Sequence, residues 1–433
     1  MFYSVDNKYK IKGDDSINPV YNEFIDFLKD NGMNYDLKEG YYWLDRMIVR
    51  AFDKQGKERK ILRIYVDDDF NISFKDYKTK PFEMESWQET AIRHKDRILQ
   101  LEQDSIATTK QLLDKYKNYK PYICHSGGKD STVLCHLVRQ VDPSIEIEFN
   151  NTSNESADTY KFIKAYDNVK ILNPKEGFWQ YLKRENFVPS RLARSCCNIY
   201  KHDLTLDNLD HNEKYLMFMG MRNAESNNRK NYQTEHQFDY YPDNWMCGLA
   251  IRQWTEIDIW LYIILKDLPI NNIYKYGYSR CGCIICPYRN DLEELITRYR
   301  FPKQAERFNK VQKSYFFAHE RWIGLNCTLD EFMNKGAWKG GQYRSEPNDE
   351  VINEFAEYKG LDKNIAVKYF NKTCCECDKN IRQKDVIAMN LKFLGRGINR
   401  FYCKNCLKEK LNINNKQWNK YIEQFKRRDC SLF

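Results

Sequence analysis

Apolar runs and amphipathic stretches alternate along the middle of the chain. The apolar runs have the length of buried strands and lie at 122–124, 145–149, 169–172 and 216–220. The amphipathic stretches have helical spacing and lie at 129–138, 155–166 and 178–186. Strands that alternate with helices form a parallel sheet that helices cover on both faces. The pattern therefore predicts an α/β fold with a parallel sheet between helices.

The first part of the chain predicts a separate, small α+β module over 1–85. Helical spacing over 21–28 precedes two strand-like runs, 47–52 and 61–66, which flank a polar turn. Ser86 and Glu89 then match a capping box, a side-chain pattern that satisfies backbone donors at a helix start. We expect that helix to reach Tyr116. The module itself shows no catalytic chemistry.

The last third of the chain changes character. Helical spacing continues over 291–322, after Pro287, and a cysteine-rich segment begins near residue 373. We therefore expect four parts: the N-terminal module, a central α/β domain over 86–300, a helical extension over 301–370 and a small cysteine-rich unit over 371–433.

Composition excludes two classes of protein. Hydrophobic residues make up 42% and charged residues 30% of 433, which supports a packed core and excludes wholesale disorder. No apolar run approaches the roughly 20 residues of a membrane span, and the first residues lack a secretory signal. We expect a cytoplasmic protein without a membrane partner. The net charge of +9 permits a nucleotide or nucleic acid partner without requiring one.

A glycine loop separates the strand at 122–124 from the helix that follows. It reads Ser126-Gly127-Gly128-Lys129-Asp130-Ser131. Two glycines let the backbone approach an anion closely, and a helix N-terminus offers free N–H groups. The serine hydroxyls can add donors, and we expect Lys129 to be an exposed catalytic side chain beside a phosphate or sulfate. An ordinary glycine turn is the alternative, but it does not explain the whole hexapeptide.

At this loop the chain resembles the PP-loop ATP pyrophosphatases, and among them the phosphoadenosine phosphosulfate (PAPS) reductase family. Further matching motifs extend the resemblance over residues 90–300: Asn151-Thr152 with Glu155 and Thr159-Tyr160, Gly220–Ser226 with Arg229, and Trp254–Trp260 with Leu268–Asn271, Tyr274 and Gly277. The resemblance implies a twisted sheet of the adenine-nucleotide-hydrolase type. It also implies an adenine nucleotide (ATP, adenylylsulfate or PAPS) bound at the loop.

Two arginines in the second motif are candidate anion ligands. Arg222 and Arg229 follow a strand end, where guanidinium groups can hold phosphate or sulfate with two parallel hydrogen bonds. Glu225 can orient one of them. A surface ion pair is the alternative.

A first set of cysteines combines a tandem pair with a distant C-x-x-C. Cys196 and Cys197 are followed, after 85 residues, by Cys283 and Cys286. Four such thiolates can surround an iron–sulfur cluster, and a zinc site or buried thiols are the alternatives. The arrangement is similar to that of the iron-dependent adenylylsulfate reductases, which implies a 4Fe-4S cluster on these four residues. Cys281 either replaces one ligand or is a free thiol.

A second set predicts a zinc site. Cys374 and Cys377 are separated by 25 residues from Cys403 and Cys406. Paired C-x-x-C knuckles are typical of tetrahedral structural zinc, and a unit this small depends on such a metal to fold. A second cluster or a redox pair is the alternative. Cys375 makes the first knuckle ambiguous, and the basic residues around the knuckles suit a nucleic acid or a protein contact.

One cysteine near the end of the chain is a weak candidate nucleophile. The segment 429–433, Asp-Cys-Ser-Leu-Phe, is similar to the Glu-Cys-Gly-Leu-His tail that carries the nucleophile in sulfonucleotide reductases. Gly and His are replaced, however, and a zinc unit intervenes. An incidental Cys430 on a solvated basic end is the competing interpretation.

Three functional hypotheses follow. The first is a reductase that cleaves an adenylylated sulfate with electrons from a donor protein. The second is an ATP-dependent PP-loop sulfurtransferase that adenylates an acceptor such as a nucleic acid and then replaces the AMP with sulfur. The third is a non-catalytic nucleotide sensor with a zinc module. The sequence leaves the acceptor, the electron or sulfur donor and the oligomeric state open.

Overall fold

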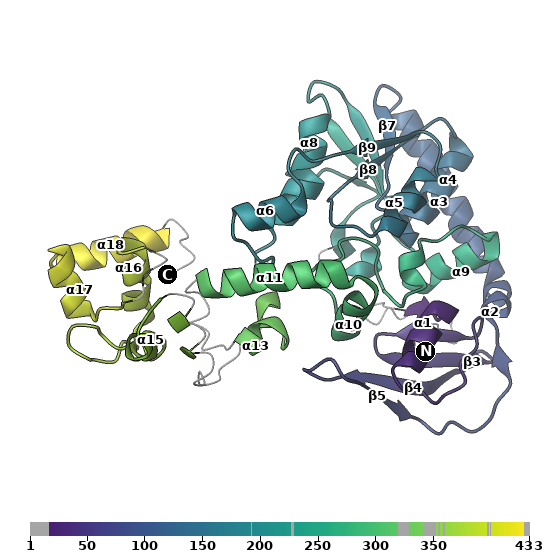
Figure 1. The fold of residues 1–433 in the computed structure, drawn as a ribbon. Coiled ribbons are helices and arrows are strands. Elements are labelled where there is room, and N and C mark those ends of the chain that lie inside the picture. Colours follow the sequence, from purple (N-terminus) through teal and green to yellow (C-terminus); the bar gives the residue numbers. More distant parts are fainter. Residues whose placement is uncertain are drawn as a thin grey trace. The chain divides into compact units, whose positions relative to one another are not determined.

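The protein is described here from a computed structural model (Figure 1). It describes residues 17–191, 193–226, 229–318, 329–340, 352–353, 356–357, 360–395, 398 and 400–427. Their contacts divide the chain into two compact units. The first unit comprises Met1–Tyr181 and Ala193–Ala305, and the second comprises Leu182–Leu192 and Glu306–Phe433.

The first unit begins with a six-stranded antiparallel sheet in the order β1-β2-β3-β4-β5, with β6 beside β3. Its strands are β1 (Ile17–Pro19), β2 (Tyr42–Asp45), β3 (Ile48–Asp53), β4 (Glu58–Val66), β5 (Ile72–Asp76) and β6 (Met84–Glu85). Helix α1 (Asn22–Asp30) buries Phe24, Ile25, Phe27 and Leu28. The two predicted strands correspond to β3 and β4, and the predicted turn joins them.

Two helices follow where the sequence predicted one. The capping box at Ser86 and Glu89 is present at the start of α2 (Trp87–Arg93). At His94 the backbone leaves the helical region, with φ −102° and ψ 10°, and α3 (Lys95–Lys115) begins after it. The break sets α2 and α3 apart as separate segments, and the second ends one residue before the predicted Tyr116.

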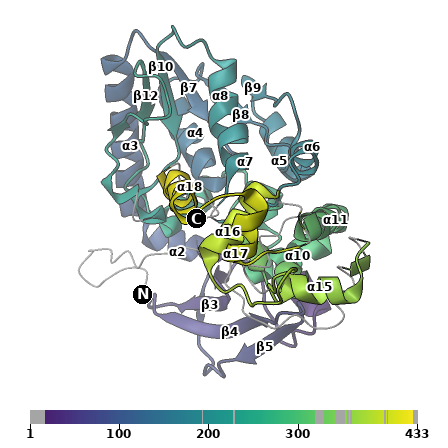
Figure 2. The same ribbon diagram turned by 90° about the vertical axis from the view of Figure 1, so that its left-hand side faces the viewer.

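The central sheet is the predicted parallel one. Its order is β11-β12-β10-β7-β8-β9, and β11 is its only antiparallel strand. The strands are β7 (Lys120–Cys124), β8 (Glu146–Asn150), β9 (Val169–Leu172), β10 (Tyr215–Met219), β11 (Glu235–His236) and β12 (Trp245–Gly248). Figure 2 shows β10 and β7 side by side in the middle of this sheet. The carboxyl ends of β7, β8 and β10 therefore meet at one edge.

Alternate side chains of this sheet point to its two opposite faces, and each face packs against a different layer. Phe218 and Gly248 face helix α3, since Cβ on Gly248 would lie 2.9 Å from a methyl group of Leu112. Met217 and Trp245 face the opposite way, into an aromatic cluster with Phe238 and Tyr241. On the α3 side, α4 (Lys129–Val141) and α9 (Glu256–Lys266) pack beside α3 (Figure 1). The other helical segments around the sheet are α5 (Ala157–Lys164), α6 (Phe178–Arg184), α7 (Ser195–Cys197), η1 (Asn198–Asp203), α8 (Leu204–Asn208), η2 (Asn223–Glu225), η3 (Arg229–Asn231) and η4 (Asn272–Tyr274).

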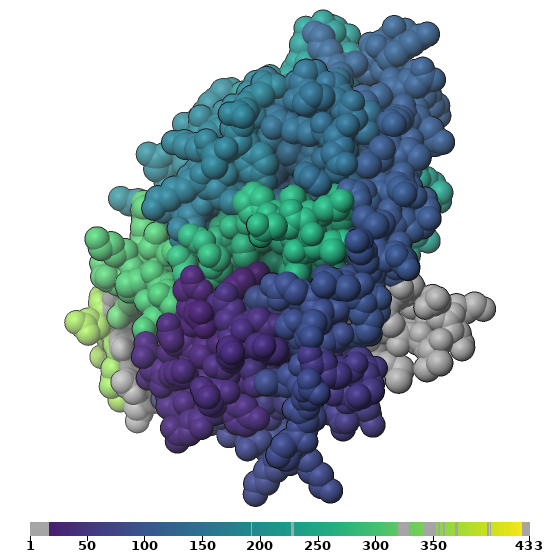
Figure 3. Space-filling view, turned by 90° about the vertical axis from the view of Figure 1, so that its right-hand side faces the viewer, coloured from purple at the N-terminus to yellow at the C-terminus, as the bar shows by residue number. Residues whose placement is uncertain are grey.

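Helix α9 also joins the central domain to the N-terminal sheet. The indole N–H of Trp260 donates to the backbone carbonyl oxygen of Ile17 at 2.8 Å. Arg97 forms a two-point ion pair with Asp258 through distances of 2.9 and 3.1 Å. In Figure 3 the purple N-terminal segment and the green segment after α9 form one continuous surface. The N-terminal module and the α/β domain therefore belong to one compact unit.

The second unit is helical. Pro302 occupies the first position of α11 (Pro302–Ala318), where a proline costs no hydrogen bond, and α10 (Asp291–Arg300) precedes it in the first unit. The remaining segments are α13 (Leu329–Met333), η5 (Ala337–Lys339), α15 (Lys363–Phe370), α16 (Lys384–Phe393), α17 (Lys404–Leu411) and α18 (Asn415–Arg427). A backbone bridge between Cys374 and Phe401 brings the two cysteine knuckles together.

Candidate functional site

The glycine loop connects the carboxyl end of β7 to the first residue of α4, as predicted. We call residues 126–131 the PP-loop. Gly127 has φ +75°, and Cβ at this position would lie 2.8 Å from the methyl group of Thr159. Cβ on Gly128 would lie 3.2 Å from the hydroxyl oxygen of Tyr274. A close approach of neighbouring elements thus favours glycine at both positions, and the positive φ requires it at Gly127 as well.

Short-range hydrogen bonds hold the PP-loop in shape. The Ser131 hydroxyl donates to the Gly128 carbonyl oxygen at 2.9 Å and lies 3.3 Å from the Ser126 hydroxyl. The Lys129 backbone N–H donates to the Tyr274 hydroxyl at 2.9 Å. The loop is therefore preorganised at the N-terminus of a 13-residue helix, the position at which proteins commonly bind phosphate.

A buried network of four charges lies directly behind the loop. Lys129 Nζ lies 2.9 Å from a Glu256 carboxylate oxygen and 3.1 Å from Asp130. Arg222 Nε donates to Asp130 at 2.6 Å, and its terminal nitrogen Nη2 pairs with Glu256. The expectation that Lys129 is exposed is wrong, because its side chain is only 3% exposed. Two cations and two carboxylates instead neutralise one another beneath the loop.

The pKa values in this network favour the charged forms of three groups. Burial alone would lower the pKa of Lys129, but the charges of Asp130 and Glu256 outweigh it and raise the pKa above its ordinary value. Burial would raise the pKa of Asp130, yet Arg222 and Lys129 lower it to about 2. Opposing charges likewise raise the pKa of Arg222 despite its burial.

Glu225 connects the two arginines of the motif. Its carboxylate accepts the backbone N–H of Arg222 at 2.9 Å and forms an ion pair with the guanidinium of Arg229. Arg229 is the more exposed of the two arginine side chains, at 34% against 2% for Arg222. Of this pair, Arg229 is thus the one that solvent or a ligand can reach, whereas Arg222 is enclosed in the network.

A cysteine-bearing segment lies against the PP-loop. We call residues 280–286 the cysteine arm. Asn271 Nδ2 donates to the sulfur of Cys281 at 3.2 Å, and the same nitrogen lies 3.2 Å from the Gly127 carbonyl oxygen. The Cys281 sulfur also lies 3.8 Å from the Ser126 carbonyl oxygen, and burial raises the pKa of its thiol to about 11. A partly exposed thiol is thereby placed beside the loop.

Two buried side chains fix the rest of the arm. The side-chain amide of Asn154 donates to the Ile285 carbonyl oxygen at 2.9 Å and accepts the Ile285 backbone N–H at 3.3 Å, and its backbone carbonyl oxygen accepts the Ile284 N–H at 2.6 Å. Arg289 donates to the backbone carbonyl oxygens of Arg280 and Cys283, both at 3.0 Å. The arm is thus attached to the segment that follows β8, next to the sheet edge where the PP-loop lies.

The tandem cysteines approach the arm from α7. Cys196 and Cys197 begin the turn that continues into η1. The pKa of Lys201 is raised by Cys283 first and also by Cys197 and Cys286, so thiols of both pairs act on this lysine. On the same side, the guanidinium of Arg194 lies 5.4 Å from the ring centre of Tyr288. The structure therefore brings the two predicted cysteine pairs to one region, with cations around them.

The first set of cysteines does not form the tight group that the C-terminal set forms. Among the described residues, Cys196, Cys197, Cys283 and Cys286 do not form a group whose sulfur atoms all lie within 4.8 Å of one another. A multi-iron cluster fills the centre of its site and needs thiolates that stand farther apart than a single zinc ion does. The nearby cations Lys201 and Arg194 suit the negative charge of such a site.

The C-terminal knuckles form a tighter group. The sulfur atoms of Cys374, Cys377, Cys403 and Cys406 all lie within 4.8 Å of one another. Cys377 lies 3.6 Å from Cys403 and 3.7 Å from Cys406. Tetrahedral zinc with Zn–S bonds of about 2.3 Å places its sulfurs about 3.8 Å apart, so these residues fit zinc.

Cys375 and Cys430 are the two remaining cysteines that the sequence singled out. Cys375 lies outside the four-sulfur group, and its backbone N–H instead donates to the Phe401 carbonyl oxygen at 2.8 Å. Of the doublet, Cys374 is therefore the residue that faces the knuckles. Cys430 lies outside the residues that the structure describes.

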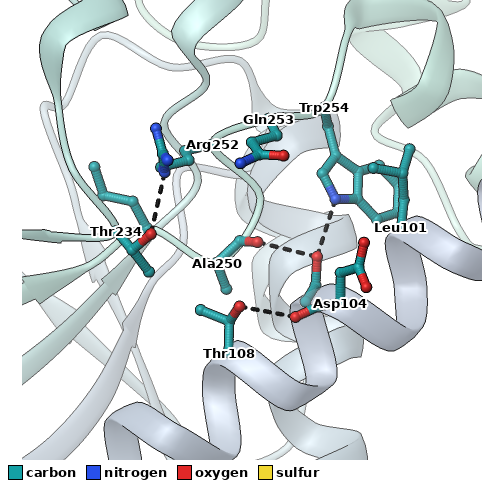
Figure 4. Close-up of a pocket in the computed structure, with 10 residues that line it drawn as sticks. Leu101, Asp104, Thr108, Thr234, Ala250, Arg252, Gln253 and Trp254 are labelled. Carbon is teal, nitrogen blue, oxygen red and sulfur yellow. Dashed lines mark hydrogen bonds between the residues drawn. The ribbon is translucent and has the colours of Figure 1, made fainter.

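A separate pocket lies between α3 and the loop that follows β12 (Figure 4). Asp104 and Arg252 line it, and Ser105 donates to the Ala250 carbonyl oxygen at 3.0 Å on its floor. The Arg252 carbonyl oxygen accepts the backbone N–H of Asn223 at 2.7 Å, which links this wall to the Arg222 motif. No cysteine is among the described residues that line this pocket.

Sequence reasoning left several residues of this site without a role. Glu256, Asn271 and Tyr274 stand in the matching motifs, but only the fold shows that they contact Lys129, Cys281 and the PP-loop. Asn154 and Arg289 carried no recognisable signal at all. Their roles depend on contacts across 131 residues and on backbone carbonyls, which a linear pattern does not reveal.

No helix among the described residues combines the length and apolar character needed to cross a membrane. Comparison with known sequences adds an independent finding. A profile of the phosphoadenosine phosphosulfate reductase domain matches residues 120–289. An adenosine 5′-phosphosulfate reductase of Bacillus cereus (strain AH187) is 31% identical over 179 residues, which cover 40% of this chain and 74% of that protein.

An uncharacterized protein of Methanocaldococcus jannaschii is 32% identical over 266 residues, which cover 58% of this chain. The match spans 64% of that relative's length. Among solved structures, the PAPS reductase of Candida auris in its phosphate complex matches with a TM-score of 0.33 and 16% identity, over 40% of this chain and 87% of the other.

Proposed function

Because this chain belongs to the phosphoadenosine phosphosulfate reductase family, we propose that it binds an adenine nucleotide at the PP-loop and performs sulfur chemistry on it with its cysteine arm. The observation that carries this proposal is the contact of Cys281 with the PP-loop through Asn271. This contact supports the proposal because it holds a thiol next to the loop at which we propose that the phosphate or sulfate binds. A nucleotide sensor needs no such thiol.

Reduction of an adenylylated sulfate is the reaction we favour. Relatives with 31% identity are named adenosine 5′-phosphosulfate reductases. The sulfur of Cys281 attacks the sulfate sulfur, an S–S bond forms, the S–O bond to the phosphate breaks, and AMP or adenosine bisphosphate leaves with the electron pair. The thiol proton goes to solvent. A dithiol donor then attacks the Cys281 sulfur, releases sulfite, and resolves as a disulfide.

The chain's own residues hold this reaction in place. The N-terminus of α4 and the serine hydroxyls of the PP-loop bind the anion, while Arg229 is the cation within reach of solvent. Lys129 and Arg222 position the loop from below rather than contacting substrate. Cys196, Cys197, Cys283 and Cys286 would hold a 4Fe-4S cluster, which would supply redox and electrostatic character beside the site.

A second candidate function is an ATP-dependent sulfurtransferase. It would adenylate an acceptor oxygen, release pyrophosphate and then replace the AMP with sulfur. The observation that favours it is the cysteine-rich C-terminal unit, whose Cys374, Cys377, Cys403 and Cys406 would hold a structural zinc ion and whose surface is basic. A reductase has no need of such a unit.

One experiment separates the two. The anaerobically purified protein is incubated with adenylylsulfate, PAPS or ATP, and sulfite and pyrophosphate are measured. Sulfite from either sulfonucleotide supports the reductase. Pyrophosphate from ATP in the presence of an acceptor supports the sulfurtransferase, and neither product from any of the three nucleotides contradicts both.

A further inference from the structure

We propose that the C-terminal unit, residues 371–433, is a nucleic-acid-binding module. The inference goes beyond the sulfur chemistry of the PP-loop and does not depend on it. This segment contains 15 Lys and Arg against six Asp and Glu, a net charge of +9. The whole chain also carries +9, so residues 1–370 are formally neutral. All of the excess positive charge is therefore concentrated in the last 63 residues.

A bound metal does not cancel this charge. Four thiolates and one Zn²⁺ at the knuckles contribute −2, which leaves +7 on the unit. A field of this sign and density attracts polyanions and steers their approach. The net charge of the C-terminal unit therefore favours a polyanionic partner over a neutral one.

Most of the described cations of this unit are exposed and few of them form ion pairs, although Lys392 and Lys410 lie over the rings of Phe425 and Tyr402. Nine lie on the described surface: Lys379, Arg382, Lys384, Lys392, Arg400, Lys410, Lys416, Lys420 and Lys426. Of these nine, only Lys426 has an ion-pair partner among the described side chains, Asp385 at 3.4 Å. A solvated face would commonly interleave acids among such cations, whereas here the acids are too few to do so.

Packing of α18 turns one of its faces outward. Tyr421 and Phe425 pack edge-to-face against Phe393 of α16, with ring centres 5.0 and 6.0 Å away. Trp418 is 2% exposed and lies beneath the ammonium group of Lys404 on α17. Figure 2 shows α16, α17 and α18 together in the yellow and light green part of the chain.

The outward face of α18 carries two exposed lysines, with the exposed Glu423 one turn further on. Lys416 and Lys420 are four residues apart, so they lie on the same side of the helix, and both are exposed. Lysines spaced along a rigid helix can contact successive phosphates of one strand. Three packed helices and a metal site would hold these charges in a fixed arrangement, which reduces the entropy lost on binding.

The described surface favours a nucleic acid over an acidic protein. Protein interfaces are anchored by exposed aromatic and large apolar side chains. The exposed large hydrophobic residues of the described structure are Tyr65, Ile92, Tyr240, Tyr288 and Tyr299, and all of them lie in the first unit. Binding to a phosphodiester backbone needs no such anchor, because released counterions supply its free energy.

The test measures salt-dependent binding by the full-length, zinc-loaded protein. Fluorescence anisotropy is recorded with a fluorescein-labelled RNA stem-loop and with a DNA duplex of the same sequence, from about 50 to 200 mM salt. We expect at least one probe to bind, with affinity that falls steeply as salt rises. The Lys416→Gln/Lys420→Gln double variant should reduce the slope of log K against log salt by about 2, since each lost phosphate contact removes about 0.9.

Two matched variants control for charge and position. Lys57→Gln/Lys75→Gln removes two exposed lysines from the neutral N-terminal sheet and should leave the slope unchanged. Lys416→Arg/Lys420→Arg keeps the charge and should bind like the wild type. Zinc content and circular dichroism report whether each variant is folded. Lys416 and Lys420 are exposed, so we expect the α18 variants to fold like the wild type.

Three results would overturn the inference: neither probe binds, the α18 variant keeps the wild-type slope, or poly-glutamate binds more tightly than both probes at the same salt. The last would point to an acidic protein partner. The binding test and the test of the proposed function can fail independently of each other. Sulfite release by a protein that binds no nucleic acid refutes only this inference, and nucleic acid binding without nucleotide turnover refutes only the proposed chemistry.

Discussion

The side-chain amide nitrogen of Asn271 lies 3.2 Å from both the Cys281 sulfur and the Gly127 carbonyl oxygen. One residue thereby connects the cysteine arm to the PP-loop. Replacement of Cys281 by Ser should keep the iron, because the four predicted ligands remain, and should abolish sulfite release, because the attacking sulfur is gone. Iron content and sulfite are measured on the same anaerobic sample.

A thiol away from the loop is the matched control for this variant. Cys375→Ser should retain activity, since Cys375 lies outside both proposed metal sets. We also expect Cys430→Ser to retain activity. Full activity in the Cys281 variant, together with loss of activity in the Cys430 variant, would move the nucleophile to the chain end and contradict the role of Cys281.

Removal of the Lys129 side chain should destabilise the protein as well as inactivate it. Lys129→Ala leaves Asp130 and Glu256 with one cation, Arg222, in a buried site. Loss of one partner from a buried charge network costs about 3 kcal/mol of unfolding free energy. Chemical denaturation measures the change, and Lys57→Ala, at an exposed turn, is the control. Unaltered stability of the Lys129 variant would show that the network is not maintained in solution.

Metal analysis should distinguish the two cysteine sets. We expect about four iron and one zinc per chain after anaerobic purification. Cys197→Ser should lose iron and keep zinc, whereas Cys377→Ser should lose zinc and keep iron, because the two sets share no residue. Two zinc ions and no iron after anaerobic reconstitution would rule out the cluster.

Glu148 should make stability depend on pH. It is buried in β8 at 4% exposure, and burial raises its pKa from 4.5 to about 7. A carboxyl with a raised pKa in the folded state stabilises the protein fully below pH 4.5 and loses this contribution as pH rises through 7. The loss is about 3 kcal/mol above pH 7.

The Glu148→Gln variant tests this assignment. Its unfolding free energy should vary less between pH 4.5 and 7 than that of the wild type, and it should be the more stable protein at pH 8. Asp114→Asn, at an exposed position of α3, should follow the wild type. A Glu148 variant with an unchanged pH profile would show that the carboxyl is solvated in solution.

The central fold was predictable because its signals are local. Buried strands such as β8 and β10 are short apolar runs, and the PP-loop carries its glycines at a strand–helix junction. The strands β1, β6 and β11 were not predicted, since three or two residues that pair only through tertiary contacts leave no periodic pattern. The break at His94 was missed for a similar reason, because the sequence around it has uninterrupted helical character.

The candidate site, like the fold, was predictable from the sequence only in part. Cysteine spacing predicted both sets, since metal ligands recur at fixed intervals in local knuckles. The burial of Lys129 was not predictable, because its partner Glu256 lies 127 residues away and reaches it only through the packing of α9 beside α4. The position of Cys281 depends on Asn271, which lies just before η4, and on Thr159 of α5.

Mass spectrometry of Cys281 tests the central claim most directly. The anaerobic protein is incubated with adenylylsulfate in the absence of a dithiol donor, quenched and digested, and every cysteine peptide is examined for a sulfonate adduct while AMP is quantified. We predict a sulfonate on Cys281 in proportion to the AMP released, and no adduct on Cys281 when PP-loop binding is blocked by excess AMP. A sulfonate on Cys430, or AMP release with no cysteine adduct, would contradict the assignment of the PP-loop and the cysteine arm to one active site.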